Sequence, residues 1–215
     1  MGSGRTTMTW TTTREAFEHA AEWFAATTAA LDAVGPDAWH RPALGEWTRS
    51  DLVGHTARAL LTVEQYLEDG TTTSTATTLD YYRTVRSSRA DPAAVAERGR
   101  QAGRGLGADR ITAVRAIVER VAGRVGSAPP DARVATPMGE WALAAYLPTR
   151  VFELTVHTID LRVAAGLDAD PPGAAAHEAL RVLGLLVADA DAEDATALLR
   201  ALTGRAALPV GWSVL

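Results

Sequence analysis

The sequence predicts an all-α fold, a bundle of four long helices with additional C-terminal helices. Apolar residues recur at intervals of three and four over several long stretches, as they do on the buried face of a helix. Runs with a period of two are few and short, which argues against a parallel α/β architecture. A chain of 215 residues can bury a sizeable core, and without cysteine that core depends on no disulfide.

The first helix is expected over residues 13–34. Thr12 or Thr13 can cap its start, because a hydroxyl at that position accepts a hydrogen bond from a free backbone N–H. Gly35 and Pro36 end it, since glycine favours turns and proline cannot continue a helix.

The second helix is expected to open at Thr48, which has Asp51 at the spacing of a capping box. Its apolar residues recur at helical spacing, and His55 borders that buried stripe. A polar loop of low complexity follows over residues 70–78.

Three further helices are expected over residues 79–90, 92–105 and 109–125, with Asp109 as the N-terminal cap of the third. Pro92 separates the first two, because the residue before a proline disfavours helical geometry. A short extended hairpin is expected over residues 133–141, before the next helix.

A long helix is expected from about Leu147 to Ala165. Pro148 would lie in its first turn, where a missing N–H is harmless. Gly166 would end it as a C-terminal cap.

The remainder is expected to form helices over 173–188 and 192–203, with the apolar stretch 206–215 packing back on the body. The expected division is therefore a helical bundle over residues 8–166 and a helical C-terminal extension over 167–215 that packs on it.

Composition excludes several classes of function. The net charge is −5, which argues against a nucleic-acid surface. No apolar run approaches the roughly 18 residues of a membrane span, and the start lacks the apolar core of a secretory signal. We therefore expect a cytoplasmic protein with no nucleic-acid or membrane partner, whose exposed helix faces are compatible with a homodimer.

One helical pattern indicates metal chemistry. Glu153 and His157 lie four residues apart and so share a helix face, where a carboxylate and an imidazole can converge on one ion. His55 is the best third ligand, from a facing helix, and Asp160 can accept a hydrogen bond from a ligand imidazole. Spacing alone also fits a surface hydrogen bond between Glu153 and His157, or a histidine that is merely part of the core.

Two segments carry a resemblance to a known family. They are residues 47–55, WTRSDLVGH, and residues 149–161, TRVFELTVHTIDL. Both resemble signatures of the DinB-like superfamily, and in particular of the N-terminal domain of mycothiol-dependent maleylpyruvate isomerases. The resemblance covers most of residues 13–166.

The resemblance implies a DinB-like four-helix bundle that binds one divalent metal, typically zinc, through His55, Glu153 and His157. Two histidines and one carboxylate also suit Fe(II) or Ni(II), so the ligands do not decide the metal. The resemblance further implies that the co-substrate is mycothiol, the small thiol of actinobacteria. Such a thiol would supply the nucleophile that a chain without cysteine lacks.

The chain also departs from that family. The maleylpyruvate isomerases carry a C-terminal α/β domain that contributes a functional arginine, whereas about 49 residues follow Gly166 here and they look helical. Arg200 or Arg205 could take that arginine's part, although a solvated arginine on a terminal helix is the commoner case. The bundle therefore carries over better than the isomerase activity.

The function expected is that of a metal-dependent enzyme that uses a thiol, as an isomerase or an S-transferase acting on a small electrophile. Arg58 and Arg150 are candidates for holding a substrate carboxylate, and Trp47 and Trp141 for walling the site. Arg150 could equally pair with an acid on its own helix, and large aromatic residues mostly serve burial. The alternatives are a non-catalytic metal- or ligand-binding protein in stress or regulation, and a metal hydrolase that needs no thiol.

Overall fold

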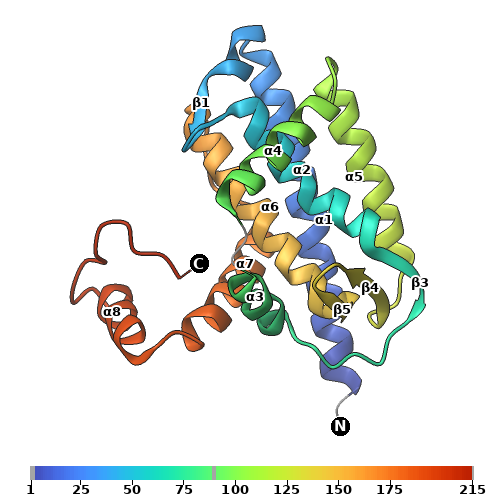
Figure 1. Ribbon diagram of the computed structural model, residues 1–215, viewed down its shortest axis with the longest axis vertical. Helices are drawn as coiled ribbons and strands as arrows, with labels where there is room; N and C mark the ends of the chain where they lie inside the picture. Colours follow the sequence, from blue (N-terminus) through green and yellow to red (C-terminus); the bar gives the residue numbers. More distant parts are fainter. Residues whose placement is uncertain (1–2, 89–90, 215) are drawn as a thin grey trace.

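The structure, a computed structural model, describes residues 3–88 and 91–214. It confirms the all-α class, because helices form the body and the strands are few and short (Figure 1). Each helix of the bundle packs against two others, in the order α1 (Ser3–Ala33), α6 (Leu143–Ala165), α2 (Arg49–Tyr66) and α5 (Arg110–Ser127). Their buried aliphatic and aromatic side chains form one core, whose burial stabilises the bundle without disulfides.

Helix α1 starts well before the predicted position, so the capping role predicted for Thr12 or Thr13 is wrong. Thr13 lies inside the helix, where its hydroxyl donates a 2.9 Å hydrogen bond to the Glu178 carboxylate of α7 (Gly173–Ala188). That partner lies 165 residues away, and so local sequence could not indicate it. The predicted end is confirmed, since Gly35 has a φ of 113°, which glycine adopts at little cost.

The start of α2 follows the prediction closely. After the short helix η1 (Pro36–His40), a small hairpin of β1 (Pro42–Leu44) and β2 (Trp47–Thr48), which we did not predict, leads into α2. The Thr48 hydroxyl accepts from the Asp51 N–H at 3.2 Å, and the Asp51 carboxylate accepts from the Thr48 N–H at 3.0 Å. This is the predicted capping box, which satisfies two backbone donors at the helix start.

A three-stranded antiparallel sheet closes one end of the bundle. The hairpin predicted over residues 133–141 is confirmed as β4 (Ala132–Thr136) and β5 (Gly139–Ala142). The loop predicted over 70–78 is wrong at its start, because β3 (Leu67–Thr71) pairs with β4. A polar strand of this kind is stabilised by its distant partner rather than by its own sequence.

The middle helices lie close to where the sequence placed them, although the first ends before the predicted residue 90, and residues 89–90 lie outside the described part of the chain. The helices are α3 (Thr78–Ser87) and α4 (Pro92–Gly105), with the break between them before Pro92. The Asp109 carboxylate accepts a 3.0 Å hydrogen bond from the backbone N–H of Thr112 and caps α5 as predicted.

Helix α4 lies unusually close to α2 because both carry glycine at their contact. A Cβ on Gly54 of α2 would lie 2.1 Å from the backbone nitrogen of Gly103 in α4. A Cβ on Gly99, one turn earlier in α4, would lie 3.3 Å from the Cβ of His55. Only residues without side chains allow the two backbones to approach so closely.

Helix α6 starts at Leu143, four residues before the predicted Leu147. Pro148 therefore lies in the second turn, and its predicted place in the first turn is wrong. The earlier start is stabilised because the Ala144 N–H, a free donor of the first turn, binds the Pro130 carbonyl at 2.8 Å. The predicted end at Gly166 is confirmed, with a φ of 70°.

The C-terminal helices are those predicted, α7 and α8 (Ala192–Leu202). Helix α7 packs on α1 and α6, whereas α8 contacts α7 and projects from the bundle (Figure 1). Within the described part of the chain, no helix is long and apolar enough to cross a membrane.

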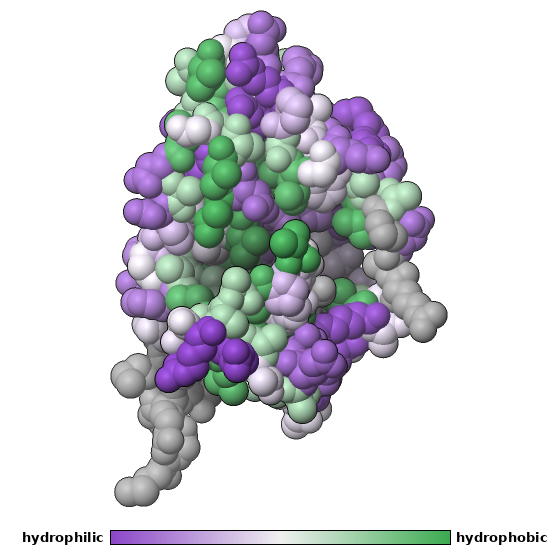
Figure 2. Space-filling view, turned by 90° about the vertical axis from the view of Figure 1, so that its left-hand side faces the viewer, coloured by the Kyte–Doolittle hydropathy of each residue, from purple (hydrophilic) through white to green (hydrophobic). Residues whose placement is uncertain are grey.

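The segment 206–215 was predicted to pack on the body, but most of its described residues, 206–214, are exposed instead. It returns through a 2.6 Å hydrogen bond from Arg86 to the Val214 carbonyl. Large apolar side chains are exposed on α7, on α8 and after α8, namely Leu180, Leu199, Leu202 and Val210. Figure 2 shows apolar residues along the middle of one face with hydrophilic residues at its edges. The homodimer expected from exposed helix faces stays a prediction.

Candidate metal centre

Helix α6 places three polar side chains on one face. Glu153, His157 and Asp160 follow each other at intervals of four and three residues, so they stack along the same side of the helix. The Nε2 atom of His157 lies 3.3 Å from Glu153 Oε2, and its Nδ1 atom lies 3.2 Å from Asp160 Oδ2. The imidazole is thus held between two carboxylates, one at each nitrogen.

Helix α2 brings the third group to this face. The rings of His55 and His157 meet edge to face with their centroids 4.8 Å apart. One potential ligand atom from each of His55, Glu153 and His157 lies within 4.8 Å of the other two. The other side of His55 contacts Trp47, at 4.4 Å between ring centroids, which limits how the imidazole can turn.

The charges of the three groups are set by burial and by one another. Burial and the neighbouring His157 lower the pKa of His55 to about 4, so this ring is neutral at pH 7. Burial acts against the charged form of His157, but its hydrogen bonds to Asp160 and Glu153 outweigh burial and raise its pKa to about 9. Burial likewise opposes ionisation of Glu153, yet the His157 hydrogen bond and the Arg150 charge lower its pKa to about 2.

This donor set fits a divalent cation. An ion with bonds of 2.0–2.2 Å to tetrahedral ligands separates those ligand atoms by roughly 3.4 Å, close to the observed 3.3 Å between Glu153 and His157. The buried Nδ1 atom of His55 has no hydrogen-bond partner within the described residues, so a ring lone pair is free for a cation. Asp160 behind His157 is the usual carboxylate partner of a ligand imidazole, since it fixes the ring and its tautomer.

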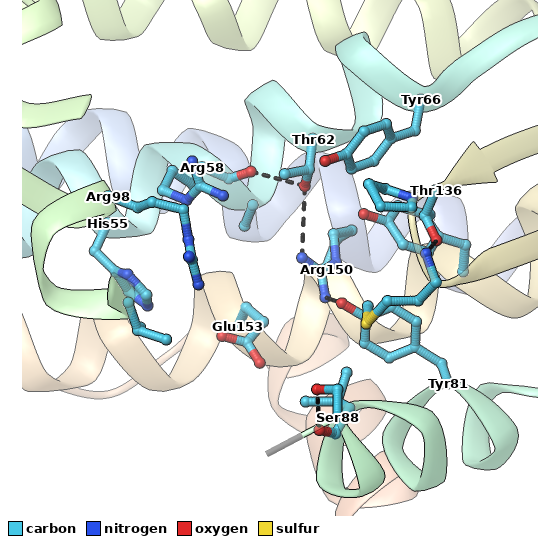
Figure 3. A pocket seen from close by; sticks show the side chains of 16 residues that line it. His55, Arg58, Thr62, Tyr66, Tyr81, Ser88, Arg98, Thr136, Arg150 and Glu153 are labelled. Carbon is cyan, nitrogen blue, oxygen red and sulfur yellow. Dashed lines mark hydrogen bonds between the residues drawn. The ribbon is translucent and has the colours of Figure 1, made fainter. Parts of the chain in front are cut away.

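A cavity of about 570 Å³ adjoins this cluster (Figure 3). His55 and Glu153 line it, together with side chains from α2, α3, α4, α6 and the β4–β5 turn. Its volume is within the range of small-molecule sites in proteins, and apolar surface makes up most of its lining. A ligand in the cavity can therefore reach the histidine–carboxylate cluster from one side.

Arg58 and Arg150, the two arginines singled out from the sequence, both line the cavity, but they differ in burial and in hydrogen bonding. Arg150 is buried, and its guanidinium donates to the Tyr81 hydroxyl at 2.9 Å and to the Thr149 hydroxyl at 2.9 Å. It also lies over the rings of Tyr81 and Tyr146. Arg58 is half-buried and makes no hydrogen bond through its side chain within the described residues.

The two tryptophans and the two C-terminal arginines lie outside the cavity lining. Trp47 is stacked behind His55, and Trp141 packs edge to face on Tyr81 with centroids 5.6 Å apart. Arg200 and Arg205 are exposed, on α8 and just after it.

Sequence reasoning missed Arg98 of α4 and the tyrosines that line the cavity. A signal for Arg98 was present, because Gly99 and Gly103 lie four apart in a predicted helix and indicate a close contact there. The partner of that contact, Gly54, lies beside His55, but pairing the two segments required the fold.

A comparison with known families decides the relationship. The family described as Mycothiol maleylpyruvate isomerase N-terminal domain matches residues 7–162. The chain belongs to this family. The maleylpyruvate isomerase N-terminal family match covers the bundle and ends before α7, which confirms the resemblance seen in the two motifs. No curated protein and no solved structure matches the chain significantly.

Proposed function

We propose that the protein is a divalent-metal enzyme, with zinc as the expected ion, that uses mycothiol as co-substrate against a small electrophile. The observation that carries this proposal is the convergence of His55, Glu153 and His157 within 4.8 Å at the edge of the cavity. Two histidines and a carboxylate are typical of working metal sites, which keep a position open, whereas structural sites are mostly closed by four protein ligands.

The chain's own residues prepare this site in three ways. Asp160 fixes the His157 ring through Nδ1 and so directs Nε2 to Glu153. Glu153 stays ionised and offsets positive charge at the cluster. When bound, a divalent ion would lower the pKa of a thiol at its open position and so make the thiolate available near neutral pH.

Two reactions follow from a thiolate in the cavity. The sulfur can add to an activated double bond, the new single bond can rotate, and loss of the thiol then gives the isomer. Alternatively the adduct takes up on carbon the proton that the thiol gave up and keeps the carbon–sulfur bond, and the product is then a thioether of mycothiol. Both reactions use an external thiol, in keeping with a chain that contains no cysteine.

The first test is metal content. Protein expressed with ample metal should contain close to one zinc ion per chain by elemental analysis. The variant His157→Ala should lose that metal, whereas His177→Ala, an exposed histidine on α7, should retain it. Wild-type protein without bound metal after such expression would refute the proposal.

The second test is turnover. The metal-loaded protein is incubated with mycothiol and a panel of electrophiles, and isomers and thioethers are measured by mass spectrometry. Consumption of an electrophile only when the thiol is present supports the proposal. Turnover without any thiol would instead support a metal hydrolase, and thiol binding without any turnover would support a non-catalytic binding protein.

A further inference from the structure

The cavity is positively charged although the chain as a whole is acidic. Three guanidiniums, those of Arg58, Arg98 and Arg150, line it against the single carboxylate of Glu153. The net charge of the chain is −5, so this local excess is opposite in sign to the rest of the molecule. A concave site with such a charge attracts anions.

Two of the three arginines have no counter-ion within the described residues. Neither Arg58 nor Arg98 lies within 4.0 Å of a carboxylate there, and neither donates a side-chain hydrogen bond. The neighbours on the same helix behave differently, because Arg100 and Arg104 both pair with Glu97, at 3.6 and 2.7 Å. Among the described residues, the arginine of α4 that lines the cavity is therefore the one without a carboxylate partner.

The close contact of α2 and α4 brings these two arginines together. Arg58 follows His55 by one helical turn, and Arg98 immediately precedes Gly99, whose Cα faces His55 and Trp47. Figure 3 shows both side chains beside His55 and on the same side of the cavity, with Glu153 across from them.

The positive charges of Arg58 and Arg98 repel each other. Burial lowers the pKa of Arg58 below its ordinary value, and the nearby Arg98 lowers it further. Arg150, by contrast, is already engaged by hydroxyl groups and aromatic rings. An anion between Arg58 and Arg98 would relieve their repulsion and accept hydrogen bonds from two forked donors.

We propose that Arg58 and Arg98 form an anion-binding subsite beside the candidate metal centre, which takes an oxyanion group, a carboxylate or a phosphate, of the second substrate. The inference deepens the proposed function by assigning the electrophile a negatively charged group. The subsite itself consists of residues outside the three candidate metal ligands, so it can be tested separately from the metal.

Binding of simple anions tests this subsite. Calorimetry measures the affinity of metal-loaded and metal-free protein for succinate, for inorganic phosphate and for the neutral ester dimethyl succinate. The variants are Arg58→Gln, Arg98→Gln and the milder Arg58→Lys, with Arg104→Gln as a control on the same helix. Metal content and the thermal midpoint are recorded for each variant.

We expect succinate or phosphate to bind and the ester not to bind, with affinity reduced roughly 10- to 100-fold by either glutamine substitution. Arg58→Lys should weaken binding less, because it keeps the charge and loses the fork. Arg104→Gln should bind like the wild type. A carboxylate or a phosphate group is assigned according to which anion binds more tightly.

The proposal is overturned if neither anion binds, or if both glutamine variants bind as the wild type does. The proposal is also overturned if anion binding requires the metal but is unchanged by the arginine substitutions. That result would be compatible with the proposed metal site. If the anion binds in an arginine-dependent manner to a protein that takes up no zinc, the result supports the anion-binding subsite and refutes the proposed metal-dependent function.

Discussion

Replacing Gly54 with alanine should separate the two helices that form one side of the cavity. The new Cβ would lie 2.1 Å from the backbone nitrogen and 2.4 Å from the Cα of Gly103, and 2.6 Å from the carbonyl oxygen of Gly99. All three neighbours are backbone atoms, so no side chain can turn aside to make room. The helix α4 itself must move.

The size of the effect follows from these distances. Ordinary contacts of a Cβ begin near 3.4 Å, so the backbones have to separate by about 1.3 Å. Overpacking of this kind costs about 1–3 kcal/mol, and a clash with two backbone segments belongs at the upper end. Alanine recovers up to about 1 kcal/mol of helix propensity, which leaves a net loss of about 2 kcal/mol. For a chain of this length that loss lowers the midpoint of thermal unfolding by roughly 4–8 °C.

Gly123→Ala is the matched control for this experiment. Gly123 is exposed within α5, and a Cβ there would meet nothing within 4 Å. It should raise the free energy of unfolding by up to about 1 kcal/mol, because only helix propensity changes. Thermal and urea unfolding followed by circular dichroism measure both variants. A midpoint for Gly54→Ala at or above that of the wild type would refute the close packing of α2 and α4.

Three further predictions concern the metal centre and the helix that carries His55. Asp160→Asn should weaken zinc binding roughly 10- to 100-fold in a chelator competition, because the carboxylate no longer orients His157. Zinc binding at pH 7 should release about one proton, since His157 has a pKa of about 9 without metal and must give up its Nε2 proton. The apparent zinc affinity should therefore rise about tenfold per pH unit up to about pH 9. Calorimetry at several pH values measures this affinity, and buffers of different ionisation enthalpy give the number of protons released. Thr48→Ala should cost about 1 kcal/mol in urea unfolding, because the capping box is lost.

The elements that the sequence predicted well are those determined by interactions between residues close together in the chain. The capping box of Thr48 and Asp51 and the cap of Asp109 involve residues three apart, so a short window contains the whole interaction. The helix ends at Gly35 and Gly166 follow from the backbone angles that glycine adopts. For the same reason Glu153 and His157 could be placed on one face before any fold was known.

The elements that sequence predicted poorly depend on distant partners. Thr13 looks like a helix cap, yet its hydroxyl binds Glu178 from the other end of the chain. The strand β3 looks like a polar loop until β4 pairs with it. Arg98 lies in an unremarkable amphipathic helix, and only the glycine contact between α2 and α4 brings it beside His55. These interactions join segments that no local pattern connects.

The two parts of the site therefore have different origins in the sequence. The candidate metal ligands lie within the two motifs that carried the resemblance, and the family match over residues 7–162 includes both motifs. The arginines that set the charge of the cavity come partly from α4, which contributes to neither motif. A chain can thus retain the three ligands while α4 changes the charge presented to the second substrate. Substrate preference should accordingly follow the residue at position 98 rather than the ligands, because metal binding and anion recognition depend on different helices.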